Sequence, residues 1–123
     1  QNARQGAFCV YVAELDGEVV GFGALSPYKE RAAYRTSVED SVYIRRDLGR
    51  QGIGRVMLSH LLTAAADGGF HSVMARITTL STGSIALHES LGFRLVGIER
   101  EIGRKFNKWL DVALMQCLLH EIE

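Results

Sequence analysis

A glycine-rich segment in the first half of the chain constrains the fold more than any other feature. Residues 41–62 read SVYIRRDLGRQGIGRVMLSHLL: a β-branched run, a basic loop and an amphipathic helix. Gly49, Gly52 and Gly54 lie in the loop, where glycine permits backbone conformations that other residues avoid. The first N–H groups of a helix lack partners within it, and together with the helix dipole they attract anions. The segment therefore predicts a strand–loop–helix unit that binds the pyrophosphate of a ligand.

The spacing of these glycines does not match the two best-known phosphate-binding loops. The dinucleotide fingerprint is G-x-G-x-x-G, and the ATP-binding loop ends in Gly-Lys followed by Ser or Thr. Residues 49–54 read GRQGIG, and no Lys-Ser or Lys-Thr pair follows them. The loop also has an alternative interpretation, as a plain connector between a strand and a helix.

Composition and charge exclude several classes of protein. The 123 residues are 47% hydrophobic and 23% charged, which is typical of one globular domain spanning residues 1–123. Because 14 basic residues balance 14 acidic ones, no overall field favours nucleic acid or an anionic membrane. The sequence shows no membrane-length apolar run and no signal-peptide pattern, so we expect a cytoplasmic protein. Cys9 and Cys117 lie in apolar runs and are expected to be buried free thiols, and the four histidines lack metal-ligand spacing.

Hydrophobic periodicity and turn residues predict the order β-β-β-α-β-α-β-β. Asp16-Gly17 is a hairpin signal, and Gly21 and Gly23 indicate a bulge or a close backbone approach. Strands are expected at residues 8–15, 18–25, 37–44, 72–77, 94–101 and 109–119, and helices at 52–67 and 84–91. Helices mixed with strands at such short spacing predict an α/β fold with one mixed sheet flanked by helices.

The loop and several spaced segments resemble the GCN5-related N-acetyltransferase (GNAT) family. In the family's acetyl-CoA pattern, Q/R-x-x-G-x-G/A, Gly52 and Gly54 occupy the two small positions. Gly49 stands where the family usually has Gln or Arg, a donor that Arg50 would replace. The segments VAELDGEVVGF, SPYKERAAY, SVEDSVYI, GRQGIG, SIALHESLGF and KFNKWLDV are similar to the phosphinothricin and methionine sulfoximine acetyltransferase subgroup.

This resemblance implies a GNAT fold and transfer of acetyl from acetyl-CoA to the primary amine of a small, amino-acid-like substrate. It also implies a homodimer, whereas the expectation of no metal cofactor rests on the spacing of the four histidines. Similar proteins carry a strand and one or two helices ahead of the matched region. We therefore expect this chain to lack an N-terminal segment that helps to shape the substrate site.

Two residues match the catalytic positions of the subgroup. Glu39, within SVEDSVYI, is the candidate general base for the substrate ammonium. Its neighbour Asp40 is a weaker candidate, because strand alternation directs it to the other face. His88, within SIALHESLGF, stands where many acetyltransferases have a tyrosine that protonates the leaving thiolate. The alternatives are a solvated carboxylate at a strand end and a structural histidine.

The resemblance also assigns binding roles. The main chain of Val42, Tyr43 and Ile44 would contact pantetheine, and Ser81 stands where similar proteins commonly have an Asn that contacts the cofactor. In loop 28–34, Arg31 is the candidate partner of a substrate carboxylate, with Tyr34 nearby, although a solvated loop is the simpler interpretation. Trp109 and Asp111 resemble a closing hairpin, or serve as a core anchor and a turn partner. The expected pyrophosphate contacts are Arg50, Gln51, Gly52, Ile53, Gly54 and Arg55.

Other functions stay open at this stage. An acetyltransferase for protein N-termini or lysines would need an open peptide groove, and Arg31 favours the small substrate. A non-catalytic acyl-CoA-binding sensor would not need a base, and Glu39 argues against it. A dinucleotide-binding module is disfavoured by the loop spacing and by the hairpin that precedes it.

Overall fold

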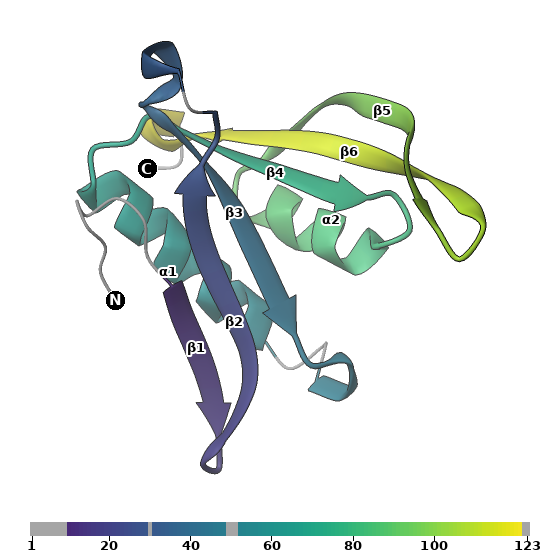
Figure 1. Ribbon diagram of the computed structural model, residues 1–123. Coiled ribbons are helices and arrows are strands. Elements are labelled where there is room, and N and C mark those ends of the chain that lie inside the picture. The colour runs from purple at the N-terminus through teal and green to yellow at the C-terminus, as the bar shows by residue number, and fades with distance from the viewer. Residues whose placement is uncertain (1–9, 30, 49–51, 122–123) are drawn as a thin grey trace.

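The computed structural model of the protein describes residues 10–29, 31–48 and 52–121 (Figure 1). Its elements follow the predicted order, with three strands before the first helix, one strand between the helices and two strands after them. In chain order they are β1 (Val10–Leu15), β2 (Glu18–Pro27), β3 (Ser37–Ile44), α1 (Ile53–Asp67), β4 (Ser72–Thr78), α2 (Thr82–Ser90), β5 (Arg94–Lys105) and β6 (Lys108–Leu118). The first strand was predicted to begin at residue 8, and Cys9 was predicted to be a buried thiol. Residues 8 and 9 lie outside the described residues.

The strands form one mixed sheet in the order β1-β2-β3-β4-β6-β5. β3 and β4 pair in parallel, and the other neighbours pair antiparallel. A parallel pair needs a long crossover, which α1 provides. The parallel ladder is short, because it joins only Ser37–Glu39 to Ser72–Met74. Beyond it the two strands diverge (Figure 1), and the predicted α/β architecture is confirmed.

Both helices contribute side chains to one core on one face of the sheet. Leu58 and Leu61 of α1 are fully buried against Val38 of β3 and Met115 of β6, and α2 packs its apolar side chains against the same cluster. Cys117 is a buried free thiol, as predicted, and burial raises its pKa to about 11. The other face of the sheet is not covered by either helix.

Gly23 explains why α1 can approach the sheet so closely. A Cβ atom at this position would lie 2.6 Å from Cγ of Met57 on α1, so Met57 would have to move to admit a side chain here. The predicted close backbone approach occurs at Gly21, where a Cβ would lie 2.6 Å from the carbonyl oxygen of Tyr43.

The boundaries of several elements differ from the prediction, and β2, for example, continues to Pro27, two residues beyond its expected end. β5 continues to Lys105, four residues beyond its expected end. A bulge shifts the register between Glu99 and Gly103, and pairing with β6 resumes beyond it. Glu101 has a φ of 53°, and its N–H donates to Oδ1 of Asp111 at 2.8 Å. α2 begins at Thr82, two residues earlier than expected. Among the described residues, neither helix is long and apolar enough to span a bilayer.

Candidate functional site

The divergence of β3 from β4 leaves a stretch of backbone without a strand partner on one side. Val42, Tyr43 and Ile44 pair with β2, but the described ladder with β4 ends at Glu39. Backbone N–H and C=O groups form hydrogen bonds whenever they can, so this edge is free to bind an extended ligand that carries amide groups. The side chains of Val42 and Ile44 are half-buried, and that of Tyr43 is exposed.

The N-terminus of α1 lies at the end of the same strand. Gly52 occupies the N-cap position with a φ of 82°, and no side chain of the described residues caps the helix. The first turn of α1 holds no acidic residue, and a Cβ on Gly52 would meet no described atom within 4 Å. As far as the described residues go, nothing compensates this helix end, which suits an anion. Gly49, Arg50 and Gln51 lie outside the described residues.

The other loop residues make contacts within the protein. Gly54 faces α2, where a Cβ would lie 3.2 Å from Cδ2 of Leu87. Arg55 donates from Nη2 to Oγ of Ser90 at 2.9 Å, so its guanidinium is directed to the end of α2. Both residues thus help to hold α1 against α2, in addition to any contact with a ligand.

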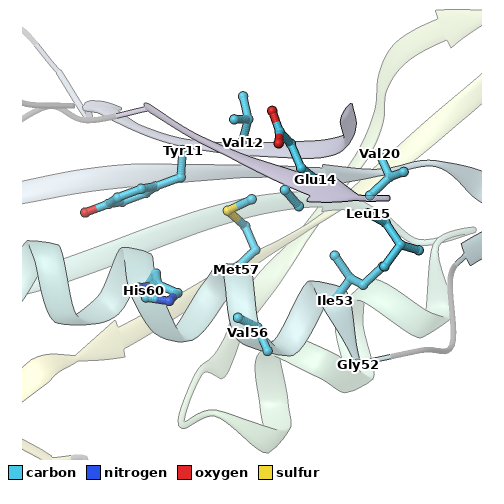
Figure 2. A pocket seen from close by; sticks show the side chains of 11 residues that line it. Tyr11, Val12, Glu14, Leu15, Val20, Gly52, Ile53, Val56, Met57 and His60 are labelled. Atoms are coloured by element: carbon cyan, nitrogen blue, oxygen red, sulfur yellow. The ribbon is translucent and has the colours of Figure 1, made fainter. Parts of the chain in front are cut away.

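A cavity of about 400 Å³ opens between β1 and α1 beside Gly52 (Figure 2). In Figure 2, Ile53 and Met57 of α1 point toward β1, and Tyr11 and His60 lie at the other end. The walls are mostly apolar and belong to the face of the sheet that carries the helices. Of its lining residues, only Gly52 and Ile53 were predicted to bind a ligand.

Glu39 lies on the opposite face of the sheet, at the point where β3 and β4 part. Its side chain is half-buried, and this burial raises the pKa of its carboxyl. The positive charge of Arg76 lowers that pKa, whereas the charge of Asp40 raises it further. A carboxylate whose pKa moves toward neutrality is a better proton acceptor for an ammonium group. Sequence reasoning missed Arg76, although it is the charged position in the otherwise apolar run VMARI.

Asp40 and His88 form a buried pair between β3 and α2. Nε2 of His88 lies 3.1 Å from Oδ1 of Asp40, and Nδ1 lies 2.8 Å from the carbonyl oxygen of Ser84. That carbonyl can only accept, so Nδ1 carries a proton, and a proton must also lie between Nε2 and Asp40. Burial alone lowers the pKa of His88, but the hydrogen bond and charge of Asp40, aided by the Ser84 carbonyl, raise it overall.

These contacts do not suit the acid role predicted for His88. The side chain is only 2% exposed, and both ring nitrogens already have partners. An acid for a thiolate needs a proton that points at the ligand. The geometry therefore favours the alternative interpretation, in which His88 ties α2 to β3.

The predicted substrate loop is ordered around a short 3-10 turn, Ala32–Tyr34. Arg31 is exposed at its start, and its carbonyl oxygen accepts from the N–H of Tyr34 at 2.9 Å. The ring of Tyr34 meets the ring of Tyr28 edge-on, with centroids 6.3 Å apart. Both candidate residues are accessible, and within the described chain neither of them forms a hydrogen bond or an ion pair with Glu39.

Ser81 and the closing hairpin lie at the far end of β4. Oγ of Ser81 lies 3.1 Å from Oγ1 of Thr78, just before α2 begins. Trp109 is 59% exposed, so it is not the core anchor of the alternative interpretation. Cζ of Arg104 lies 4.6 Å from the centroid of its ring. Asp111 does serve as a turn partner, through its bond to the backbone of Glu101. Among residues 10–29, 31–48 and 52–121, no cluster of three possible metal ligands occurs.

Comparisons with known proteins match this geometry to one family. The family model described as "Acetyltransferase (GNAT) family" matches residues 1–93. Phosphinothricin N-acetyltransferase of Alcaligenes faecalis is 39% identical over 85% of this chain, which covers 54% of that protein. The L-methionine sulfoximine/L-methionine sulfone acetyltransferase of Pseudomonas paraeruginosa is 36% identical over 96% of the chain and 69% of its own length.

Solved structures give the same result. The phosphinothricin acetyltransferase of Sinorhizobium meliloti, in complex with acetyl-CoA, is 38% identical with a TM-score of 0.88. The match covers 94% of this chain and 62% of that one. The chain thus spans between about half and two thirds of the length of these relatives.

Proposed function

This chain belongs to the acetyltransferase (GNAT) family, and on that premise we propose that it transfers acetyl from acetyl-CoA to the primary amine of a small, amino-acid-like substrate. The observation that carries the proposal is the parting of β3 and β4 at Glu39, which brings a free strand edge and a half-buried carboxylate together. Relatives named for phosphinothricin and methionine sulfoximine support the substrate class.

The residues present fit acetyl-CoA. The open N-terminus of α1 at Gly52 would hold the pyrophosphate, together with Ile53, Gly54, Arg55 and the predicted donors Arg50 and Gln51. The backbone edge of Val42, Tyr43 and Ile44 would hold the pantetheine arm, and Ser81 lies beyond it at the end of β4. When bound, the co-substrate supplies the acetyl group as a thioester.

We assign Glu39 as the general base. It accepts the proton that the substrate ammonium must lose before its nitrogen can attack. Burial raises the pKa of Glu39, which makes it a stronger base than an exposed carboxylate. In the overall exchange a C–N bond forms and the C–S bond of the thioester breaks. The substrate nitrogen loses two protons: Glu39 accepts one, and the other offsets the proton that the leaving sulfur takes up. His88 is assigned to holding α2 against β3 instead of the acid role, because of its two internal hydrogen bonds.

The other finer assignments rest on the resemblance and on position. Arg31 would pair with the substrate carboxylate, with Tyr34 packed nearby, since both are accessible and a guanidinium matches a carboxylate bidentately. A homodimer and a cytoplasmic location are part of the same proposal.

The decisive experiment measures thiol release from acetyl-CoA by the full-length protein with a panel of amines. The panel contains phosphinothricin, methionine sulfoximine, methionine sulfone, a polyamine and a short peptide. We expect saturable turnover of the amino-acid analogues. Preference for the peptide or the polyamine would keep the reaction and reject the small amino-acid substrate. Tight acetyl-CoA binding without turnover of any amine would favour a non-catalytic sensor.

Replacing Glu39 by Gln tests the assigned base. We expect kcat to fall about 100-fold or more, because general base catalysis contributes about 10²–10⁴. The KM for acetyl-CoA should change little, since the substitution leaves the α1 N-terminus intact. Glu18→Gln, an exposed carboxylate in the β1–β2 hairpin, is the matched control and should behave as wild type. Unchanged turnover of Glu39→Gln across the pH range would remove Glu39 as the base.

A further inference from the structure

A hydrogen bond joins the last turn of α2 to the first turn of α1. Arg55 is the third residue of α1, and its Nη2 donates to Oγ of Ser90, the last residue of α2, at 2.9 Å. Three residues earlier on α2, Leu87 lies against Gly54, where a Cβ would be 3.2 Å from Cδ2 of Leu87. The last turn of α2 therefore lies against the helix end that is expected to receive the pyrophosphate of acetyl-CoA.

The hydroxyl group of Ser90 is held in place by a second hydrogen bond. Its Oγ donates to the carbonyl oxygen of Leu87 at 2.7 Å. A hydroxyl group has a single proton, so with that proton on Leu87 the oxygen can only accept from Arg55. Ser90 thus presents a fixed acceptor to the guanidinium of Arg55, and most of the N–H donors of that group remain for other partners.

The partner of Arg55 is neutral, which is not true of every arginine in the chain. Nη2 of Arg76, for comparison, lies 2.6 Å from a carboxylate oxygen of Glu99. Within the described part of the chain, Arg55 forms no ion pair with a carboxylate. A hydroxyl group fixes the position of a positive charge without neutralising it. Because helical side chains lean toward the N-terminus of their helix, this charge lies over the first turn of α1.

We propose that Ser90 is a positioning residue for acetyl-CoA binding: it fixes the guanidinium of Arg55 over the first turn of α1, as a positive charge that is free to bind the pyrophosphate. The inference rests on the proposed function and deepens it, because it gives a residue of α2, outside the glycine-rich loop, a part in pyrophosphate binding. A guanidinium that is held before the ligand arrives loses less conformational freedom on binding. Ser90 therefore acts on the affinity for the co-substrate and not on proton transfer at Glu39.

Three substitutions at Ser90 separate the position of the guanidinium from its charge. Ser90→Ala removes the acceptor, so the Kd for CoA should rise about threefold or more. Ser90→Asn keeps a neutral acceptor and should bind CoA nearly as tightly as wild type. Ser90→Asp is isosteric with Ser90→Asn but neutralises the guanidinium, so its Kd should rise about tenfold or more. A hydrogen bond that only holds the two helices together would give Ser90→Asn and Ser90→Asp the same affinity for CoA.

The test is isothermal titration calorimetry of the full-length protein with CoA, which requires no turnover. Each Ser90 variant is measured again in an Arg55→Gln background. If Ser90 acts through Arg55, Ser90→Ala and Ser90→Asp should cause no further loss of affinity there. Thr63→Asp adds the same charge at an exposed position about two turns farther along α1, and its Kd should stay within about twofold of wild type. With saturating acetyl-CoA, kcat should be unchanged in all three Ser90 variants.

Each outcome supports or overturns a stated proposal. Losses of affinity in Ser90→Ala and Ser90→Asp that disappear in the Arg55→Gln background support the inference. Wild-type affinity in these variants overturns it and leaves the use of acetyl-CoA intact. A loss that persists in the Arg55→Gln background also overturns it, because Ser90 then acts on CoA without Arg55. A wild-type protein that binds no CoA overturns the proposed function, and the inference with it.

Discussion

Gly52 holds a backbone conformation that other residues disfavour, at the point where a phosphate is expected to bind. Its φ of 82° lies in the left-handed region, and the space around its α-carbon is open. Gly52→Val should therefore cost about 1–2 kcal/mol of stability from the backbone alone. It should also raise the KM for acetyl-CoA about tenfold or more, because a side chain would stand where the phosphate approaches. Steady-state kinetics and thermal unfolding measure the two effects.

Gly17 offers a matched control for this substitution. It has the same φ of 82° and equally open surroundings, but it lies in the β1–β2 turn. Gly17→Val should lose similar stability and keep the wild-type KM for acetyl-CoA. Equal losses of affinity in both variants would show that Gly52 acts through folding alone.

The sequence pattern predicts which face of the sheet a residue occupies, but it does not predict the residue's distant partners. Alternation along β3 correctly separates Glu39 from Asp40, because successive strand residues face opposite sides. The partner of Asp40 could not be predicted, since His88 lies 48 residues away and reaches it only after α2 packs on the sheet. The Arg76–Glu99 pair escaped prediction for the same reason, because it crosses β6, a strand that follows both residues in the chain.

At the scale of elements, the buried pair between α2 and β3 makes the packing of the helix depend on pH. The pKa of His88 is raised in the folded protein, so its contribution is fully present below the unfolded value of about 6.5. It is lost as the pH rises through the folded value. Asp40→Asn removes the charge that raises this pKa and keeps the volume. As the pH rises from about 6.5 through the raised pKa of His88, we expect wild type to lose more free energy of unfolding than Asp40→Asn does. Urea unfolding at successive pH values measures this difference.

A second variant separates the pair from the general effects of pH. His88→Gln leaves Asp40 buried without its cationic partner, and breaking a buried pair in this way costs about 3–5 kcal/mol. A loss below about 1 kcal/mol would mean that the imidazole contributes little to holding α2 on the sheet.

Local sequence patterns predict where the strands and helices lie along the chain. They predict only part of how these elements are arranged relative to one another. Turn residues and apolar periodicity predict the strands and helices because these signals are local. The length of the β3–β4 ladder is not local, since it depends on how the core on the helix face draws the strands together. The extension of β5 depends on a bulge that the Asp111 carboxylate stabilises from the neighbouring strand.

At the scale of the molecule, the β5–β6 hairpin exposes several large apolar side chains. β5 forms one edge of the sheet, and Phe106 at the tip of the hairpin is 88% exposed. The other exposed large apolar side chains of the hairpin are Leu95, Val96, Ile98, Ile102 and Trp109. Edge strands and exposed apolar patches of this kind mark interaction surfaces.

The proposed homodimer would bury this hairpin, and charged substitutions on it test that arrangement. Ile102→Glu should raise the dissociation constant of the dimer about 100-fold or more, because an unpaired carboxylate would enter an apolar interface. Val19→Glu changes a similarly exposed side chain in the β1–β2 hairpin, at the other edge of the sheet, and should leave the dimer intact. Sedimentation equilibrium of the full-length protein measures both constants. A monomeric wild type, or equal dissociation of both variants, would show that the exposed β5–β6 hairpin is not the surface that joins two copies.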